Sequence, residues 1–365
     1  MLISQKELNE AFALISFSSR QRQAIETVWR QLNQNPLLER LARKDAAGLA
    51  DPHGPEKIEA DAAQLTALLG GLADVYPALI LLTRVSWLKG EYALHGIHEA
   101  VLRDALSDIP LWMTHFENRA GRVGLGEYTW LTNHMRMRLF RLGRLEYIFT
   151  KSRVRAWFYR NDALSQCVAL ADSGLRFEVS GQLCTETCGQ VATHHCENGV
   201  ITGYPVDSLG RIQPQPVSLP ANQWRMALAP GDPVLDVHIP EGPPMTPDAI
   251  TASLQAAIPF YRDHLGLREE RAFTCSSWLM SPALPQLLPG SNLAAFQKRF
   301  RVVPYTLRDN QVFERVYGKG FTAWQEMPME TRLQRGVRDW YMAGGVIRQM
   351  QGVILRKEME EANHD

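Results

Sequence analysis

The sequence has no excess of charge of either sign, because its 39 lysines and arginines equal its 39 aspartates and glutamates. A protein that grips nucleic acid usually carries a basic surface, so we expect no nucleic-acid partner. No apolar run approaches the roughly 20 residues that cross a bilayer. The opening MLISQKELNE lacks the basic-then-apolar pattern of a signal peptide. We therefore expect a cytoplasmic protein without a membrane span.

Cysteine is also scarce, with five in 365 residues. An odd, small number in a chain of this length argues against a disulfide scaffold. Three of the cysteines gather with histidines in LCTETCGQVATHHC, and these are zinc-ligand types. Their spacing matches no paired C-x-x-C motif, so we expect an exposed loop and no metal. Zinc held by Cys184, Cys188, His194 and Cys196 is the alternative.

What the sequence does contain is enough for about two domains, with 45% hydrophobic residues. Residues 1–125 have helical spacing throughout, with Ser4 and Ser19 preceding two amphipathic runs. In residues 151–230, short β-rich runs alternate with turn signals such as Asn198-Gly199, which indicates an antiparallel meander. The sequence therefore predicts an α+β fold: a helical domain over 1–125, then a mixed-sheet domain with flanking helices over 126–365 that contains the meander.

The stretch from Val234 to Phe300 contains the predicted strand–helix–strand unit around which we expect the second domain to be built. VLDVHIP alternates apolar and polar residues, which predicts a strand with Asp236 and His238 on one face. Thr246-Pro247 then predicts the start of a helix that ends at Gly266, and AFTCSSWLM predicts a second strand. A helix that begins just beyond a strand presents unpaired N–H groups to an anion. An ordinary crossover with no ligand fits the same pattern.

Upstream, LFRLGRLEYIF also has β character, and Gly143 predicts a bulge within it. The same LFRLGRLEY, followed by GDPVLDVHIPEGPPMTPDAITASL, FTCSSWLMSPALPQLLPGSNLAAFQKRF and RLQRGVRDWYMAGG, resembles bacterial acyltransferase-domain proteins. These have a helical N-acyltransferase N-terminal domain followed by a GNAT-like C-terminal domain. The resemblance runs in order over residues 60–350.

The resemblance implies transfer of an acyl group from acyl-CoA, or from an acyl carrier protein, to a small-molecule or peptide amine. In GNAT folds the fourth strand splays from the fifth, and the following loop and helix grip the carrier's pyrophosphate. Residues 234–239 look like the fourth strand, 242–246 the loop and 272–280 the fifth strand. The implied donor-binding residues are Ile239, Gly242, Met245, Thr246, Ser276, Ser277, Trp278 and Asn292.

This sequence departs from the family's pattern at the loop. The usual Gln/Arg-x-x-Gly-x-Gly/Ala motif is absent, prolines at 243, 244 and 247 remove N–H donors, and Asp248 adds a negative charge. No tyrosine occupies the helix after the fifth strand, where many GNAT enzymes keep a general acid. An acyl carrier protein is for these reasons an alternative donor.

Amine attack on a thioester needs a base for the proton and donors for the oxyanion. His238 is the candidate base, because a histidine ordinarily titrates near pH ~6.5. Asp236 could orient its imidazole. Cys275, on the adjacent predicted strand, could protonate the leaving thiolate or form an acyl-enzyme. The rival hypotheses are a Cys275-based acyl-enzyme and a catalytically degenerate GNAT fold that acts as a binding or regulatory module.

Overall fold

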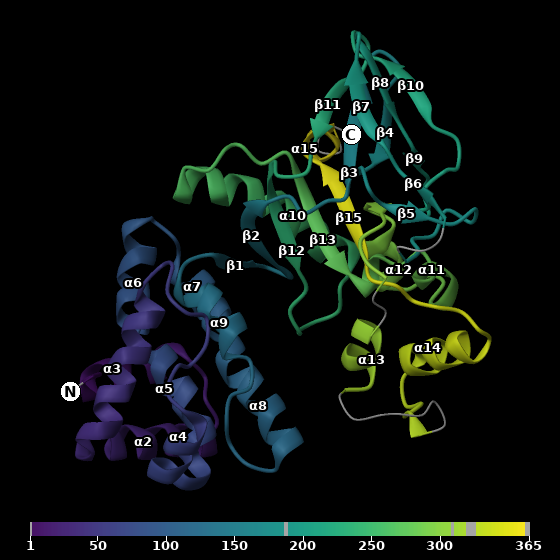
Figure 1. Cartoon of the computed structure of the whole chain (residues 1–365). Coiled ribbons are helices and arrows are strands. Elements are labelled where there is room, and N and C mark those ends of the chain that lie inside the picture. The colour runs from purple at the N-terminus through teal and green to yellow at the C-terminus, as the bar shows by residue number, and fades with distance from the viewer. Residues whose placement is uncertain (1, 186–188, 308–309, 319–325, 362–365) are drawn as a thin grey trace. The chain divides into compact units, whose positions relative to one another are not determined.

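The computed structural model describes residues 2–185, 189–307, 310–318 and 326–361. The chain divides into two compact units (Figure 1). The first contains residues 1–142 and 262–266, and the second contains residues 143–261 and 267–365. As predicted, the fold class is α+β, with a helical N-terminal region followed by a mixed-sheet region. Cys188 of the zinc alternative lies outside the described residues.

The first unit is built from helices whose beginnings are set by side-chain caps. Ser4 and Ser18 each form a capping box, with Glu7 and Gln21 as the reciprocal partners. The second cap is therefore Ser18, one residue earlier than predicted, and Ser19 is the first helical residue. The elements are α1 (Gln5–Leu14), α2 (Ser19–Gln34), α3 (Pro36–Ala50), α4 (Ala62–Leu69), η1 (Gly70–Val75), α5 (Tyr76–Leu82), α6 (Val85–Leu94), α7 (Glu99–Leu106), α8 (Asp108–Ala120), α9 (Tyr128–Met135) and the strand β1 (Leu139–Leu142).

The segment from α4 to α6, Ala62–Leu94, is the most apolar part of this unit. By length and composition alone it could cross a membrane, because an 18-residue window within it has a mean hydropathy of 1.8, so the expectation that no run reaches this length is wrong. Half of its most apolar window is buried inside the protein, and Tyr76 at the start of α5 is fully buried. Its hydroxyl donates to Asp45 Oδ2 at 2.7 Å. A buried core helix passes the same test, so this stretch is weak evidence for a membrane span.

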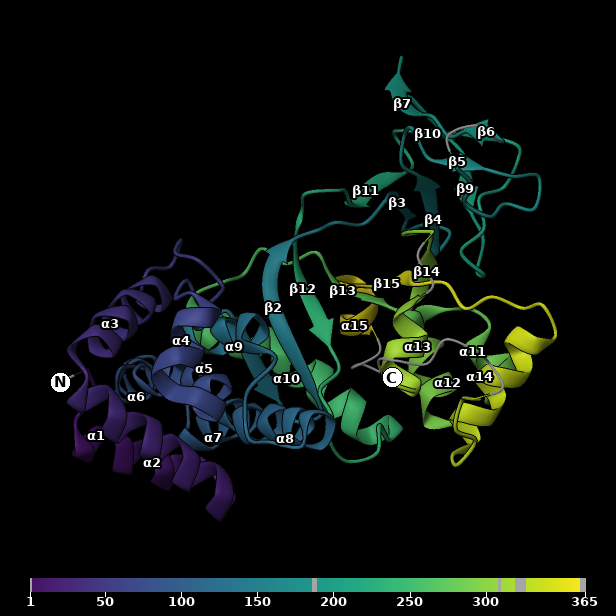
Figure 2. The same cartoon turned by 60° about the horizontal axis from the view of Figure 1, so that its bottom comes forward.

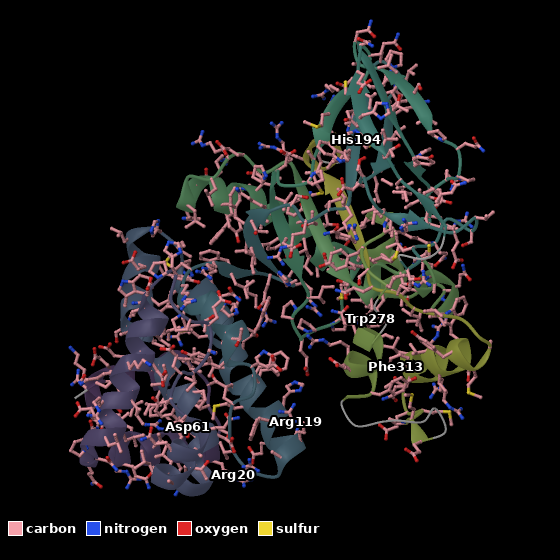
Figure 3. The ribbon with its side chains drawn as sticks, in the orientation of Figure 1. Arg20, Asp61, Arg119, His194, Trp278 and Phe313 are labelled. Atoms are coloured by element: carbon pink, nitrogen blue, oxygen red, sulfur yellow. The ribbon has the colours of Figure 1, made fainter. Side chains whose placement is uncertain are left out.

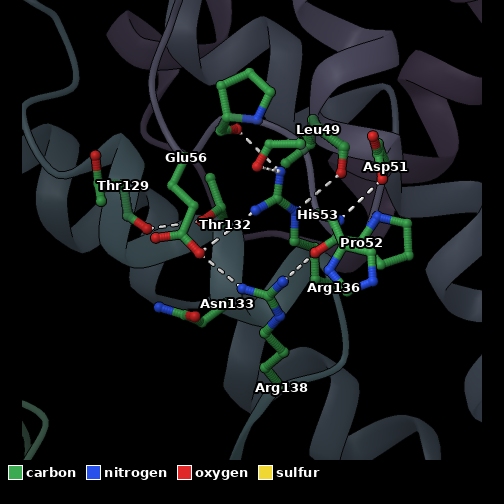
Figure 4. Close-up of polar contacts among 12 residues, drawn as sticks. Leu49, Asp51, Pro52, His53, Glu56, Thr129, Thr132, Asn133, Arg136 and Arg138 are labelled. Carbon is green, nitrogen blue, oxygen red and sulfur yellow. Dashed lines mark hydrogen bonds and ion pairs between the residues drawn. The ribbon is translucent and has the colours of Figure 1, made fainter.

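Arg136, just after α9, forms hydrogen bonds with the end of α3 and with the chain that follows it (Figure 4). Its Nη2 donates to the carbonyl oxygens of Gly48 at 2.9 Å, Gly54 at 3.1 Å and Pro55 at 2.9 Å, and its Nε donates to Leu49 at 3.3 Å. These acceptors include carbonyls of the last turn of α3, which have no partner within the helix. One guanidinium therefore satisfies backbone carbonyls at the end of α3 and in the loop after it.

The second unit is centred on a mixed sheet with the strand order β2-β12-β13-β15-β14. β12 pairs antiparallel with β2 and parallel with β13, while β15 pairs antiparallel with both β13 and β14. The strands are β2 (Leu145–Lys151), β12 (Pro233–His238), β13 (Ala272–Ser277), β14 (Arg301–Val303) and β15 (Met350–Leu355).

The predicted meander lies between β2 and β12 in the chain and forms three small antiparallel sheets (Figure 2). Phe158 and Leu228 of the meander pack with Val234, Ala272 and neighbouring apolar residues, which places it against one face of the central sheet. Its strands are β3 (Ala156–Asn161), β4 (Gln166–Ala171), β5 (Arg176–Phe177), β6 (Gln190–Val191), β7 (His194–Glu197), β8 (Val200–Gly203), β9 (Pro205–Val206), β10 (Val217–Pro220) and β11 (Arg225–Leu228).

Helix α10 covers the other face of the sheet. Ser253 Oγ lies 2.9 Å from the Tyr147 hydroxyl, and the Tyr261 hydroxyl donates to the Tyr147 carbonyl at 2.5 Å. The helices of this region are α10 (Pro247–Leu265, whose last turn belongs to the first unit), η2 (Trp278–Met280), α11 (Leu284–Leu287), α12 (Asn292–Gln297), α13 (Asn310–Val316), α14 (Arg332–Met342) and α15 (Arg356–Glu361).

Two local predictions are corrected by the structure. Gly143 does not form a bulge: it has φ +68° and lies in the turn that separates β1 from β2. The predicted strand 272–280 ends at Ser277, and its last three residues form the 3₁₀ helix η2. The Ser277 hydroxyl caps that helix by accepting from the Leu279 N–H at 3.1 Å, so the chain turns where the apolar pattern alone would continue.

Candidate active site

The central sheet opens between its two parallel strands. The pairing of β12 with β13 ends at Asp236 and Thr274. Beyond this pair, β12 continues to His238 alongside β2, and β13 continues to Ser277 alongside β15. Each strand therefore stays paired on its outer side beyond the point where the pairing between the two strands ends. This is the splay that the family resemblance implied.

Asp236 and His238 lie on the same face of β12, at the mouth of this opening. Asp236 Oδ2 is 3.3 Å from His238 Nε2, and both side chains are about one quarter to one third exposed, at 25% and 30%. The Thr274 hydroxyl donates to the other carboxylate oxygen, Oδ1, at 2.7 Å. Asp236 therefore lies within ion-pair distance of the imidazole, although Nε2 itself is buried and makes no hydrogen bond to any residue that the structure describes.

Cys275 is in a different environment. It follows Thr274 by one residue and therefore points to the opposite face of the sheet, away from His238. It is 1% exposed, and burial raises the pKa of its thiol. A nucleophilic cysteine needs an accessible thiolate, so the structure disfavours Cys275 as an acyl-enzyme nucleophile or as a proton donor to the leaving group.

The residues after Cys275 have structural partners. The Ser276 hydroxyl accepts from Gln351 Nε2 at 3.0 Å, and this places a buried amide of β15 on the face that carries His238. Trp278 is 7% exposed and lies at the end of β13 (Figure 3). Its backbone N–H donates to Gln311 Oε1 at 2.8 Å. Ser276 and Ser277 remain half-buried beside the opening, so they stay candidates for donor contact.

The loop between β12 and α10 is held by a residue that sequence reasoning missed. Arg144 is 8% exposed and donates from Nε to the Pro243 carbonyl and from Nη1 to the Pro240 carbonyl, both at 2.7 Å. It immediately follows the glycine of the β1–β2 turn. The only local signal was an arginine within a mostly apolar run, and nothing in the run indicated its partners.

Within this loop, the predicted donor-binding residues differ in exposure. Gly242 and Thr246 are exposed, Ile239 is half-buried and Met245 is 6% exposed. Thr246 Oγ1 accepts from the Ala249 N–H at 3.3 Å, which is the predicted cap of α10.

A cation also lies at the beginning of α10, and sequence reasoning missed it as well. Arg299 is half-buried, and its Nη2 donates to the carbonyl oxygen of Pro247, the first residue of the helix, at 3.0 Å. The Arg299 guanidinium therefore lies at the positive end of the 19-residue helix α10. This arrangement offsets the negative charge that Asp248 adds and suits a phosphate or diphosphate.

Asn292, an implied donor-binding residue, is exposed at the beginning of α12 and does not cap that helix. Ser291 takes that role by accepting from the Ala294 N–H at 3.1 Å, and Asn292 is the first helical residue.

Two family models match consecutive parts of the chain. One, the N-acyltransferase N-terminal domain, matches residues 6–137, and the other, the GNAT-like C-terminal domain, matches residues 139–354. The fold, the splayed strands and these matches define an acyltransferase. The chain belongs to the family in which an N-acyltransferase N-terminal domain precedes a GNAT-like C-terminal domain. None of the curated proteins matches it.

Solved acyltransferase structures share the fold. One, in complex with decanoyl-CoA and teicoplanin, is 18% identical with a TM-score of 0.65. A mutant in complex with octanoyl-CoA is 18% identical with a TM-score of 0.66, and one in complex with decanoyl-CoA is 20% identical with a TM-score of 0.60. Each match covers 97% of this chain and 89% of the other.

Proposed function

We propose that the protein transfers an acyl group from acyl-CoA directly to an amine, with His238 as the general base. One observation supports this proposal above all. The pairing of β12 with β13 ends at Asp236 and Thr274, and the His238 imidazole lies on β12 just beyond that point. In the reaction, the amine nitrogen attacks the thioester carbonyl. The C–N bond forms, the C–S bond breaks and CoA leaves as the thiolate.

The proton balance gives His238 its role. The attacking nitrogen becomes acidic as the C–N bond forms, and the imidazole accepts its proton. Asp236 stabilises the imidazolium that results, and the Thr274 hydroxyl fixes the carboxylate. The leaving thiolate is protonated either by this imidazolium or by solvent. Backbone N–H groups on the inner edges of the diverging strands have no partner across the opening among the register pairs of the described strands. They are suitable donors to the thioester oxygen.

The donor assignment rests on the beginning of α10. The helix dipole and Arg299 provide positive potential at the beginning of the helix that follows β12 in the chain. The neighbouring acyltransferases of the same fold were solved with decanoyl-CoA or octanoyl-CoA. Prolines reduce the number of N–H donors in the loop, so an acyl carrier protein is the second candidate donor.

The test is thiol release from octanoyl-CoA and decanoyl-CoA in the presence of a panel of primary amines. His238→Ala should lower kcat by about 10²- to 10⁴-fold, the usual contribution of a positioned base, with the KM for acyl-CoA nearly unchanged. His53→Ala, at an exposed histidine of the first unit, is the matched control. A folded His238→Ala variant with wild-type turnover would exclude His238 as the base.

The same assay separates the alternatives. Turnover with an acylated carrier protein but not with acyl-CoA would assign the donor to the carrier. Thermal stabilisation by CoA, without turnover of any donor–amine pair, would favour a binding module. A ternary-complex kinetic pattern supports direct transfer, whereas an acyl group found on Cys275 by intact mass would support a covalent intermediate.

A further inference from the structure

A cavity of about 220 Å³ lies within the second unit, and none of the proposed donor-site residues lines it. Its walls come from four places in the chain: residues 182–183 after β5, residues 209–211 after β9, residues 281–286 around the start of α11, and the link from α14 into β15 at 346–350. Pro304, Thr306 and Trp340 complete the lining. No residue that has a role in the proposed reaction lines this cavity.

Arg348 gives the cavity a positive charge. Its Nη1 donates to Gln182 Oε1 at 2.8 Å and to the Leu183 carbonyl at 3.3 Å, both of which are neutral acceptors. Within the described part of the chain, no carboxylate lies within ion-pair distance of this guanidinium. The other arginine of the lining, Arg211, is neutralised by Asp207, whose Oδ2 is 2.8 Å from its Nη2. The cavity therefore has one uncompensated cation.

The segment that carries Arg348 is fixed by α14. The Tyr341 hydroxyl accepts from the Ile347 N–H at 3.0 Å, and Trp340 Nε1 donates to the Val346 carbonyl at 3.3 Å. Gly345 permits this packing, because a Cβ there would lie 2.3 Å from Trp340 Nε1. The segment that carries the guanidinium is therefore held in one conformation. Less conformational entropy would be lost when a ligand binds to it.

The other lining residues are mixed in character. Leu183, Leu209, Pro282, Ala283, Pro304 and Met350 contribute apolar surface, and Gln182, Ser281, Gln286 and Thr306 contribute polar surface. A cavity of about 150 Å³ accepts benzene, so this one has room for a ligand of about ten non-hydrogen atoms. A planar guanidinium in an apolar setting recognises a carboxylate, through two parallel N–H···O bonds, better than a neutral group.

We propose that this cavity binds a small amphipathic carboxylate whose acid group pairs with Arg348 and whose apolar body fills the space lined by Leu183, Pro282 and Met350. The site is separate from the thioester-transfer site. Its ligand is distinguished from an acyl-CoA by size.

The test uses 3-phenylpropanoate as probe, with 3-phenylpropanamide as a neutral compound of the same shape, and measures binding to the full chain by titration calorimetry. The acid should bind at least about tenfold more tightly than the amide, because it makes charged hydrogen bonds. Arg348→Gln should abolish that difference. Arg315→Gln, which removes an exposed arginine of α13 outside the cavity, should leave it unchanged.

Val346→Trp provides a second route to the same conclusion, because Val346 lines the cavity yet is 46% exposed. The larger side chain should block binding of the acid without altering the charge of the cavity. This variant tests the proposal if Arg348→Gln fails to fold. Equal binding of acid and amide, no binding of the acid to the wild type, or full binding by a folded Arg348→Gln variant would each overturn the proposal. Displacement of the acid by free CoA would overturn its separation from the donor site.

Discussion

The Thr274 hydroxyl donates to Asp236 across the last paired position of β12 and β13, at 2.7 Å. This hydrogen bond joins two strands that are separated in the chain by the whole of α10. It fixes the carboxylate beside His238 at the point where the sheet opens, so it connects the architecture of the splay to the proposed chemistry.

Thr274→Val should lower kcat by about tenfold, because the half-buried carboxylate loses a donor and orients the imidazole less well. The KM for acyl-CoA should change little. Thr274→Ser keeps the hydroxyl and should restore most of the activity. Steady-state kinetics and thermal melts of both variants check this. If valine and serine reduced kcat equally, the hydrogen bond would have no role in catalysis.

Arg299→Gln should raise the KM for acyl-CoA by about tenfold, because it removes a cation from the beginning of α10 where the diphosphate is proposed to bind. Kinetics with an acyl-pantetheine, which lacks the diphosphate, provide the control. The variant and the wild type should use that truncated donor equally well. An equal loss with both donors would show that Arg299 supports the helix rather than the diphosphate.

Cys275 should resist alkylation in the native protein at mildly alkaline pH. Burial raises its pKa, so the reactive thiolate is scarce, and the sulfur is also inaccessible. Peptide mass spectrometry after iodoacetamide treatment should find the exposed Cys196 modified and Cys275 modified only after denaturation. Rapid native alkylation of Cys275, accompanied by loss of activity, would reopen the acyl-enzyme alternative.

His194 should make the meander less stable in acid. Its ring stacks on Trp157 with centroids 4.5 Å apart, and its Nε2 lies 2.9 Å from the Tyr159 hydroxyl. Burial lowers its pKa. Below a histidine's ordinary pKa of ~6.5, the unfolded chain therefore binds the proton more readily than the folded chain. Stability should accordingly fall as the pH decreases from that value towards the lowered pKa.

Melting temperatures of the wild type and His194→Gln between about pH 7 and pH 5 measure this effect. The wild type should lose more stability across that range than the variant. His195→Gln, at the exposed neighbouring histidine, should behave like the wild type. Parallel curves for the wild type and His194→Gln would contradict the assignment.

Local patterns in the sequence predicted much of the frame around the site. Alternating residues predicted β12, and Thr246-Pro247 together with Gly266 predicted both ends of α10. These features depend on neighbours within a few residues, through side-chain period, capping and the left-handed conformation of glycine. The same kind of evidence failed at Ser277, where a short-range cap ends a strand that the apolar pattern would extend.

Only the tertiary structure decided which of the candidate residues meet. The β12–β13 register, the assignment of Cys275 to the buried face, and the positions of Thr274, Arg144 and Arg299 depend on contacts between segments far apart in the chain. A strand's period shows that two residues share a face but not which face is covered. Which face is covered depends on how α10 and the meander pack, because the burial of a side chain is determined by the whole sheet and not by any one strand.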